Sequence, residues 1–285
     1  MATCRTEPID AAGQHRPSGM CAAVARVLAL TFLLALAAMP AWAQPDGRTQ
    51  VIRVAAASDL RFALDEIAAT FEQQYGHRLR ISYGSTGNFA HQIRSGAPFH
   101  LFLAADERYI ETLAGDKLTR DAGTLYATGR MALVAPRGTF AGTTPTMAAV
   151  ASRLADHPGQ RFAIANPDHA PYGERGRDVL QHLGLWASLQ SRLVYGENVS
   201  QAAQFALSGN TVGGLVAWSL ALAPEIAERA DSALLPAAWH RPLKQRMVLL
   251  QDTPDGAVTL YNHLQSPQAR AVLERYGFSL PPGDR

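Results

Sequence analysis

The chain has 285 residues, with 26 basic and 24 acidic side chains and a formal net charge of +2. No basic tail, run of like charges or low-complexity block departs from this balance, so neither nucleic acid nor a membrane surface is expected as a partner. Both cysteines, Cys4 and Cys21, lie within the first 43 residues. The rest of the chain therefore has no disulfide, thiol nucleophile or thiolate metal site.

The N-terminal segment has the pattern of a secretory signal peptide. Residues 24–39 are apolar apart from Arg26 and Thr31, and Ala-Trp-Ala at 41–43 matches an A-x-A cleavage site. We therefore expect a signal peptide over 1–43, with translation starting at Met1 or Met20. The apolar stretch is short for a membrane span and no stop-transfer pattern follows it, which argues against the alternative of an N-terminal anchor and against direct membrane insertion.

The expected mature chain keeps 242 residues and a net charge of +1, because the removed segment carries three basic and two acidic residues. This length suffices for one large or two mid-sized domains. An exported chain without cysteine suits the bacterial periplasm, where we expect this protein to reside.

From residue 51 the chain alternates short apolar runs with segments of helical spacing, a pattern that indicates an α/β protein with parallel sheets. The expected strands are 51–57, 79–83 and 99–105, each followed by a helix: one at about 60–71, one that contains Phe89 and Ile93, and one at 106–114.

The same rhythm restarts at residue 130, which predicts a second lobe. Strands are expected at 130–136, 161–167, 192–196 and 212–218, with helices at 173–183 and 199–208. A last strand at 245–251 and helices at 255–265 and 267–278 should return to the first lobe. We predict a signal peptide at 1–43, lobe 1 at 44–129 plus 237–285, lobe 2 at 130–236, and a ligand cleft between the lobes.

Three of the predicted strands end in a small polar turn that leads directly into a helix. Ser58 and Asp59 follow the first strand, Ser85 follows the second, and a helix begins near Val199 after the strand at 192–196. Ligands of open α/β sheets gather at the carboxyl ends of strands, and the first N–H groups of a helix bind anions. These turns therefore predict an anion site. For Ser58 and Ser85 the alternative is simple helix capping.

A fourth candidate segment is the loop 165–176, which has two prolines and two glycines directly after a predicted strand. Tyr172 stands at its end, just before a helix, where both its N–H and its phenol could point into the cleft. The alternative is a tyrosine that packs on the loop with a solvated hydroxyl.

The turn at 84–87, Gly-Ser-Thr-Gly, looks like a phosphate loop, but Asn88 and Phe89 stand where a nucleotide loop has its lysine. Without a cation or a metal ligand, such a turn can hold a fully deprotonated oxyanion through N–H and O–H donors alone. Asp59 is an awkward neighbour, because its carboxylate would repel a dianion. We expect Asp59 to contribute its N–H, with its side chain turned outward or capping the helix.

Five motifs appear in a characteristic order: AAASDL, GSTGNFAHQIRSGAPFHLFLAAD, NPDHAPYG, ENVSQA and SPQARAVLERYGF. With them, nearly the whole mature chain resembles the periplasmic molybdate-binding component of ABC importers, the ModA-like family. The resemblance implies a two-lobed, hinge-closing α/β periplasmic binding protein of type II, with doubly wound lobes. It implies a receptor for molybdate, and for tungstate, rather than an enzyme, and no cofactor.

The resemblance also implies the binding residues Ser58, Asp59, Ser85, Tyr172 and Val199, with Val199 acting through its backbone N–H. Molybdenum would be held only as its oxyanion, through Ser58, Ser85, Tyr172 and Val199.

One segment departs from the family pattern. Many members have a tyrosine whose hydroxyl touches the ligand at the position of Ala217, at the end of Gly-Leu-Val-Ala. We expect Tyr172 to supply a phenol from a different loop instead.

The resemblance implies a small oxyanion ligand, a membrane permease driven by an ATPase as partner, and a monomer. The alternatives are a receptor for sulfate or phosphate and, from another class, a serine hydrolase with His91 or His169 as base, although no G-x-S-x-G motif is present. The nine histidines show no metal-binding spacing.

Overall fold

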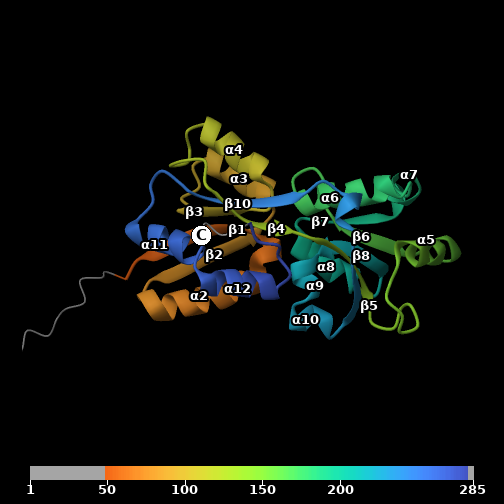
Figure 1. The fold of residues 1–285 in the computed structure, drawn as a ribbon. Helices are drawn as coiled ribbons and strands as arrows, with labels where there is room; N and C mark the ends of the chain where they lie inside the picture. The colour runs from red at the N-terminus through yellow and green to blue at the C-terminus, as the bar shows by residue number, and fades with distance from the viewer. Residues whose placement is uncertain (1–48, 282–285) are drawn as a thin grey trace, which may run out of the picture. The chain divides into compact units, whose positions relative to one another are not determined.

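The computed structural model of the protein describes residues 49–281, so the predicted signal peptide, its cleavage site and the two candidate start residues lie outside the described residues. Within this range the chain forms two five-stranded sheets with helices packed on them (Figure 1). We call the elements built on these sheets the first and second lobes. Among the described helices, none has the length and apolarity that a membrane crossing requires.

The first sheet has the strand order β2-β1-β3-β10-β4. Its strands β1, β2 and β3 are parallel, and β10 is antiparallel to both β3 and β4. The bounds are β1 Val51–Ala57, β2 Arg78–Gly84, β3 Leu101–Ala104, β4 Thr124–Gly129 and β10 Leu243–Leu249.

Alternate residues of the first sheet face two different sets of helices. Val54 and Ala56 belong to a core shared with α2, α11 and α12, whereas Ala55 of the same strand packs with α3 and α4. Helices thus cover both faces, as Figure 1 shows, and the lobe is doubly wound. The bounds are α2 Arg61–Tyr75, α3 Thr86–Arg94, α4 Glu107–Gly115, α11 Asp255–His263 and α12 Pro267–Arg275.

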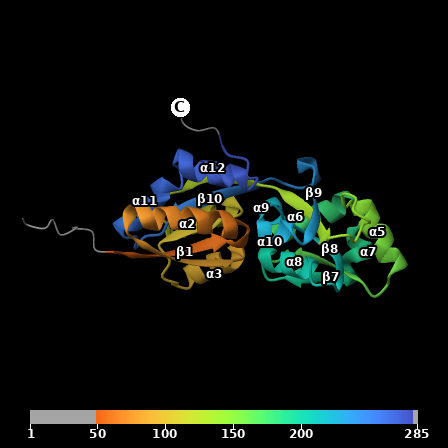
Figure 2. The same cartoon turned by 90° about the horizontal axis from the view of Figure 1, so that it is seen from below.

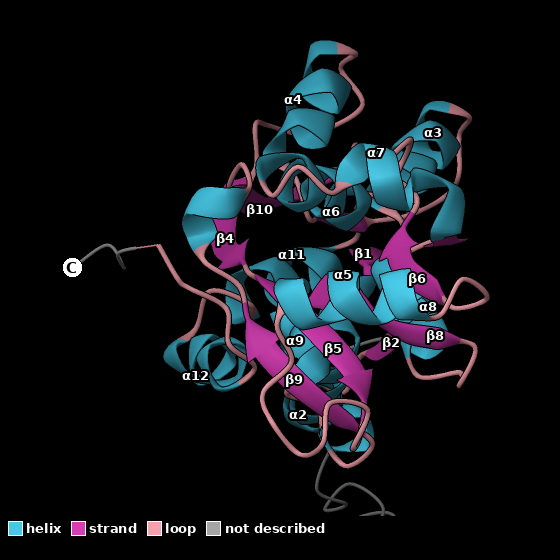
Figure 3. Cartoon of the chain, turned by 90° about the vertical axis from the view of Figure 1, so that its right-hand side faces the viewer, coloured by secondary structure: helices cyan, strands magenta, loops and turns pink. Residues whose placement is uncertain are grey.

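The second sheet has the order β7-β6-β8-β5-β9, in which β6, β7 and β8 are parallel and β5 is antiparallel to its neighbours. Figure 3 shows β5 beside β9. Its strands are β5 Met131–Pro136, β6 Arg161–Ala165, β7 Leu193–Gly196, β8 Thr211–Ala217 and β9 Ala230–Leu234. Its helices are α5 Met147–Asp156, α6 Pro171–His182, α7 Trp186–Leu189, α8 Val199–Ala206, α9 Trp218–Ala221 and α10 Pro224–Ala227.

The chain passes between the lobes twice, from β4 into β5 and from β9 into β10. Figure 2 shows the second passage, from β9 into β10. Our prediction of parallel sheets was wrong in one respect, because both sheets are mixed. The reversed strands, β5 and β10, are those whose preceding strand lies in the other sheet. A parallel strand needs a crossover connection within its own sheet, and these two strands have none.

Each of the eight predicted strands matches a strand of the structure, with both ends within two residues, but two further strands were missed. These are β4 and β9, and each is an edge strand of its sheet. Three short 3₁₀ helices complete the described elements: η1 Ser58–Leu60, η2 Gln190–Arg192 and η3 Ala237–Trp239. Of these, η1 continues directly into α2 and places Ser58 and Asp59 at the end of β1.

Candidate ligand-binding site

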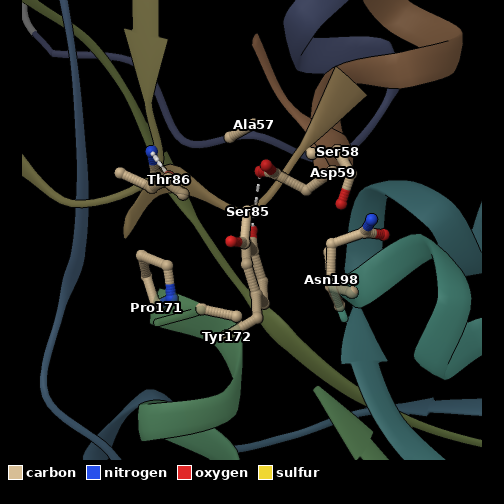
Figure 4. Close-up of a pocket in the computed structure, with 12 residues that line it drawn as sticks. Ala57, Ser58, Asp59, Ser85, Thr86, Pro171, Tyr172 and Asn198 are labelled. Carbon is tan, nitrogen blue, oxygen red and sulfur yellow. Dashed lines mark hydrogen bonds between the residues drawn. The ribbon is translucent and has the colours of Figure 1, made fainter. Parts of the chain in front are cut away.

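A small cavity lies where the N-terminal ends of four helical segments meet. The space between these ends, part of it open to solvent, is about 180 Å³, and η1 and α3 of the first lobe face α6 and α8 of the second lobe across it (Figure 4). The lining residues are Ala57, Ser58, Asp59, Gly84, Ser85, Thr86, Ala105, Ala170, Pro171, Tyr172, Asn198 and Val199. All five residues predicted to bind the ligand therefore line one cavity.

The parallel strands explain why these helix ends meet. In the first sheet β1 and β2 end in register at Ala57 and Gly84, and in the second sheet β6 and β7 end in register at Ala165 and Gly196. The carboxyl ends of parallel strands lie at one edge of a sheet, where the following helices begin. The two lobes turn these edges toward each other, so polar turns that are far apart in sequence become neighbours.

Ser58 is buried and does not cap a helix. The N-cap of η1 is Ala57, and no side chain caps this helix. Instead, the Ser58 hydroxyl accepts a hydrogen bond from the N–H of Ser200 at 3.3 Å, and the Ser200 hydroxyl donates to the Ser58 carbonyl at 2.8 Å. Because Ser200 belongs to α8, Ser58 joins the two lobes beside the cavity.

Ser85 is the N-cap of α3, so the capping alternative describes part of its role. Its hydroxyl oxygen accepts from the N–H of Asn88 at 3.4 Å and lies 2.9 Å from Nδ1 of His169. Thr86, which our sequence analysis did not single out, is buried next to it and accepts from the N–H of Ala105 at 3.0 Å. The hydroxyl-rich turn is thus held rigidly at the cavity wall.

The second lobe offers backbone donors to the cavity. Val199 is the first residue of α8, and Tyr172 follows Pro171 at the start of α6. The N–H groups of Tyr172 and Val199 have no acceptor among residues 49–281. Such unpaired donors at helix starts, with the positive end of the helix dipole, favour an anion.

The phenol of Tyr172 differs from our expectation. It is buried and donates its proton to Oδ2 of Asp59 at 3.0 Å. Burial, followed by the nearby Asp59 charge, raises the pKa of the Tyr172 phenol well above its usual value, so the phenol remains a donor. The single hydroxyl proton of Tyr172 is used in the hydrogen bond to Asp59. The donor that Tyr172 offers to the cavity is therefore its backbone N–H.

The predicted orientation of the Asp59 side chain was wrong. Its side chain is only 2% exposed and caps no helix. Oδ2 accepts from Tyr172 and from Nε2 of Gln245 at 2.5 Å, whereas Oδ1 is buried without a partner in the described part of the chain. Burial raises the pKa of Asp59 to about 6 against the opposing hydrogen bonds from Gln245 and Tyr172. Polar partners inside the protein, absent from the local sequence, draw the carboxyl inward.

Gln245 is the site residue that sequence reasoning missed most completely. It is fully buried in β10, which crosses back from the second lobe, and its Oε1 accepts from the hydroxyl of Tyr126 at 2.7 Å. The only signal was a polar amide at the start of an apolar strand. A buried amide needs partners, and here the partner is a carboxyl 186 residues away in sequence.

His169 connects Ser85 to an acidic side chain. Its Nδ1 faces the Ser85 hydroxyl at 2.9 Å, and its Nε2 lies 3.5 Å from the carboxylate of Glu197. This order of serine, histidine and acid is the observation that favours the hydrolase alternative. The histidine–carboxylate distance exceeds the reach of a hydrogen bond that orients a base, about 2.6–3.2 Å. His91, the other candidate base, is exposed on α3.

Next to the cavity, six charged side chains pair with one another across the lobes. Asp106 of the first lobe contacts Arg175 of the second at 2.5 Å, and Arg108 contacts Glu174 at 2.8 Å. Arg241 extends the set to Asp178. We call Asp106, Arg108, Glu174, Arg175, Asp178 and Arg241 the ion-pair cluster. Its three positive and three negative charges balance.

The residues 49–281 contain no group of three or more histidine, cysteine, aspartate or glutamate side chains that could hold a metal ion. The lining residues include no lysine or arginine either. What the cavity offers an anion is therefore uncharged N–H and O–H groups. To a cation, the residues that line the cavity offer one charged group, the Asp59 carboxyl.

Comparison with known proteins places these features in a family. Residues 52–279 match the model of the bacterial extracellular solute-binding proteins. The molybdate-binding protein ModA of Azotobacter vinelandii is 34% identical over 237 residues, which cover 80% of this chain and 90% of that protein. ModA of Rhodobacter capsulatus is 33% identical over 247 residues, covering 86% and 94%.

A solved structure agrees with the sequence comparison. The periplasmic molybdate-binding protein of Azotobacter vinelandii superposes with a TM-score of 0.73 at 30% identity, covering 81% of this chain and all of that chain. The fold is thus the two-lobed α/β fold of type II periplasmic binding proteins, as the sequence indicated.

Proposed function

Since the chain belongs to the bacterial extracellular solute-binding proteins, we propose that it is the periplasmic receptor for molybdate, and for tungstate, of an ABC importer. It binds the oxyanion in the cavity between its lobes and delivers it to the membrane permease. The alignments with the molybdate-binding relatives cover most of this chain and most of each relative, which supports this ligand class.

The convergence of four helix starts on one small cavity carries this proposal. Ser58 and Ser85 supply hydroxyl groups, and Tyr172 and Val199 supply N–H groups without an acceptor in the described chain. Molybdate and tungstate carry no proton at neutral pH, so a site for them needs donors only. A hydrogen bond to a charged group contributes about 1.5–3 kcal/mol, so several of them replace a cation.

Size, rather than the number of hydrogen bonds, must separate molybdate from sulfate. Both ions are tetrahedral dianions with the same demand for donors, but sulfate is smaller. We propose that the lobes, with boundaries at 44–129 plus 237–285 and at 130–236, close until these donors fit the larger ion. Sulfate then leaves some of the donors without a partner, and each such loss costs affinity.

Titration calorimetry with a panel of molybdate, tungstate, sulfate and phosphate tests the proposal. We expect micromolar or tighter binding of molybdate and tungstate and much weaker binding of sulfate and phosphate. Ser85→Ala should weaken molybdate binding about 10- to 150-fold, because one charge-assisted hydrogen bond is lost. Ser95→Ala is the matched control, because Ser95 is exposed at the other end of the same helix.

Sulfate binding as tight as molybdate binding would contradict the specificity, and unchanged affinity in Ser85→Ala would remove Ser85 from the site. Delivery to a permease predicts that the loaded protein, as a monomer, stimulates the ATPase of its importer in membranes. A loaded protein without this effect would contradict the delivery step.

The contact of Ser85 with His169 and Glu197 justifies one further assay, for the hydrolase alternative. Ester hydrolysis that disappears in both Ser85→Ala and Ser58→Ala would favour an enzyme over a receptor. We expect no such serine-dependent turnover, because the Ser85 hydroxyl caps α3.

A further inference from the structure

Asp59 is the one acidic side chain among the residues that line the cavity. A receptor for a dianion gains nothing from a carboxylate at this place, since two negative charges in a small cavity repel each other. Yet Asp59 lies inward, 2% exposed, between the two lobes. The arrangement of its two carboxyl oxygens indicates how the conflict is resolved.

The two oxygens have different surroundings. Oδ2 accepts two hydrogen bonds, from the Tyr172 hydroxyl at 3.0 Å and from the Gln245 amide at 2.5 Å. The Tyr126 hydroxyl donates to the other end of this amide at 2.7 Å, which orients the NH₂ group of Gln245 toward Asp59. Both lone pairs of Oδ2 are therefore occupied. A proton on this carboxyl has its place on Oδ1, the atom without a partner among the described residues.

Few ionisable groups act on this carboxyl. Among residues 49–281, Tyr126 of β4 and Tyr172 of α6 are the titratable side chains that face it, and burial keeps both of them protonated by raising their pKa. Gln245 of β10 is neutral, and α9 contributes the Ser219 hydroxyl, which donates to the Asp59 carbonyl at 2.8 Å. The residues of α8 beside η1 are also uncharged, with Ser200 bound to the neighbouring Ser58.

We propose that Asp59 is a neutral carboxylic acid in the ligand complex, with its Oδ1–H donating to an oxygen of the bound dianion. One proton from solvent binds to Oδ1 for each ion that binds, and it returns to solvent when the ion leaves. The group that would repel the ligand thereby becomes one of its donors. This inference rests on the proposed function, because it requires a fully deprotonated oxyanion.

Burial raises the pKa of Asp59 to about 6, which fits a carboxyl that takes up a proton at moderate pH. Below that pH the carboxyl is already protonated, and above it the binding of each ion requires the uptake of one proton from solvent. The dissociation constant for molybdate should therefore rise with pH, by about 50-fold from pH 6 to pH 8. Affinity falls because proton uptake becomes less favourable, while molybdate itself stays a dianion over this range.

Titration calorimetry with micromolar molybdate tests the inference on the full mature protein. At one pH near 7.5, two buffers of different ionisation enthalpy, both free of sulfate and phosphate, report the number of protons taken up. We expect about one proton per ion. In Asp59→Asn an amide N–H replaces the acid, so we expect no uptake, no pH dependence, and tighter binding than the wild type at pH 8.

His169→Gln is the matched comparison, because His169 is a titratable side chain that contacts Ser85, another residue that lines the cavity. We expect this variant to keep the uptake of one proton. Infrared difference spectra of the wild type should show a protonated carboxyl that appears on binding, a readout that does not depend on any variant folding.

The outcomes separate the two levels of the proposal. Wild-type protein that binds molybdate without proton uptake, or Asp59→Asn that keeps the uptake, overturns the role of Asp59 and leaves the receptor function standing. If His169→Gln loses the proton uptake while Asp59→Asn keeps it, the role of Asp59 is overturned and the receptor function also stands. Wild-type protein that binds no molybdate at any pH overturns the receptor function and this inference together.

Discussion

The cavity and the ion-pair cluster are neighbouring regions where the two lobes meet, and they differ in the charge of their side chains. The cavity is lined by uncharged donors and a single acid, whereas the ion-pair cluster brings together three positive and three negative side chains. Asp106 of the cluster directly follows Ala105, which lines the cavity. Charges are thus kept beside the cavity but are paired with each other, so the field inside it comes from helix ends and hydroxyl groups.

The pKa directions reflect this difference. Burial alone would raise the pKa of Asp106, but hydrogen bonds from Arg108 and the charge of Arg175 outweigh it, and the pKa of Asp106 is lowered. Burial raises the pKa of Asp59, and its neutral partners only moderate this effect. The same residue type is therefore ionised in one region and able to take up a proton in the other. A charged partner, rather than burial, decides between these states.

The largest effect is expected from breaking the cluster. Asp106→Ala leaves Arg175, which is 3% exposed, without its closest carboxylate, and it also removes the N-cap of α4. Breaking a buried ion pair costs about 3–5 kcal/mol of the free energy of unfolding. Urea unfolding measures this loss. Asp106→Asn keeps an oxygen for the helix cap but removes the charge, so it separates the two contributions. A loss below about 1 kcal/mol in the free energy of unfolding of Asp106→Ala would contradict the role of the ion pair.

A smaller effect is expected at Gly87, where the backbones of the two lobes come into hydrogen-bond contact. The N–H of Gly87 donates to the carbonyl of His169 at 2.9 Å, and a Cβ at residue 87 would lie 2.5 Å from that oxygen. Gly87→Ala should therefore hold the lobes apart at the cavity and weaken molybdate binding by about 1–3 kcal/mol. Calorimetry measures the affinity.

Gly115→Ala is the control for Gly87→Ala, since a Cβ at residue 115 meets nothing within 4 Å. We expect this variant to bind as the wild type does. Equal affinity in Gly87→Ala and Gly115→Ala would mean that the approach of the lobes at residue 87 does not matter for binding.

The smallest effect is expected from an ion pair within one lobe. Glu66 of α2 contacts Arg275 of α12, with side chains 42% and 58% exposed. Solvent screens such a pair, so Glu66→Ala should change the free energy of unfolding by less than about 1 kcal/mol. Urea unfolding of Glu66→Ala and of Asp106→Ala compares the two losses in the free energy of unfolding. A comparable loss in both variants would show that pairing across the lobes has no special role.

The fold was largely predictable where the pattern was local. Apolar runs marked β1, β2 and β6, and turn residues marked the starts of the helices that follow them. The strands β4 and β9 were missed, because their sequences, TLYATG and ADSAL, contain no sustained apolar run. The reversal of β5 and β10 could not be read locally either, since it depends on the passage between lobes.

The candidate site divides in the same way. Ser58, Ser85 and Val199 stand at strand ends, a place that the sequence reveals, and they do line one cavity. The inward turn of Asp59 depends on Gln245 and Tyr172, which are distant in sequence and approach it only in the fold. Local rules describe an exposed aspartate at a helix start and contain no information on such partners.

The most direct test of the binding site is a crystal structure of the molybdate-soaked protein with anomalous scattering recorded at the molybdenum edge. We predict a single strong peak in the cavity, within hydrogen-bonding reach of Ser58, Ser85 and the N–H of Val199 through the ion's oxygens. A peak at another place, or one in the cavity surrounded chiefly by carboxylates, would contradict the account that neutral donors from both lobes hold the ion.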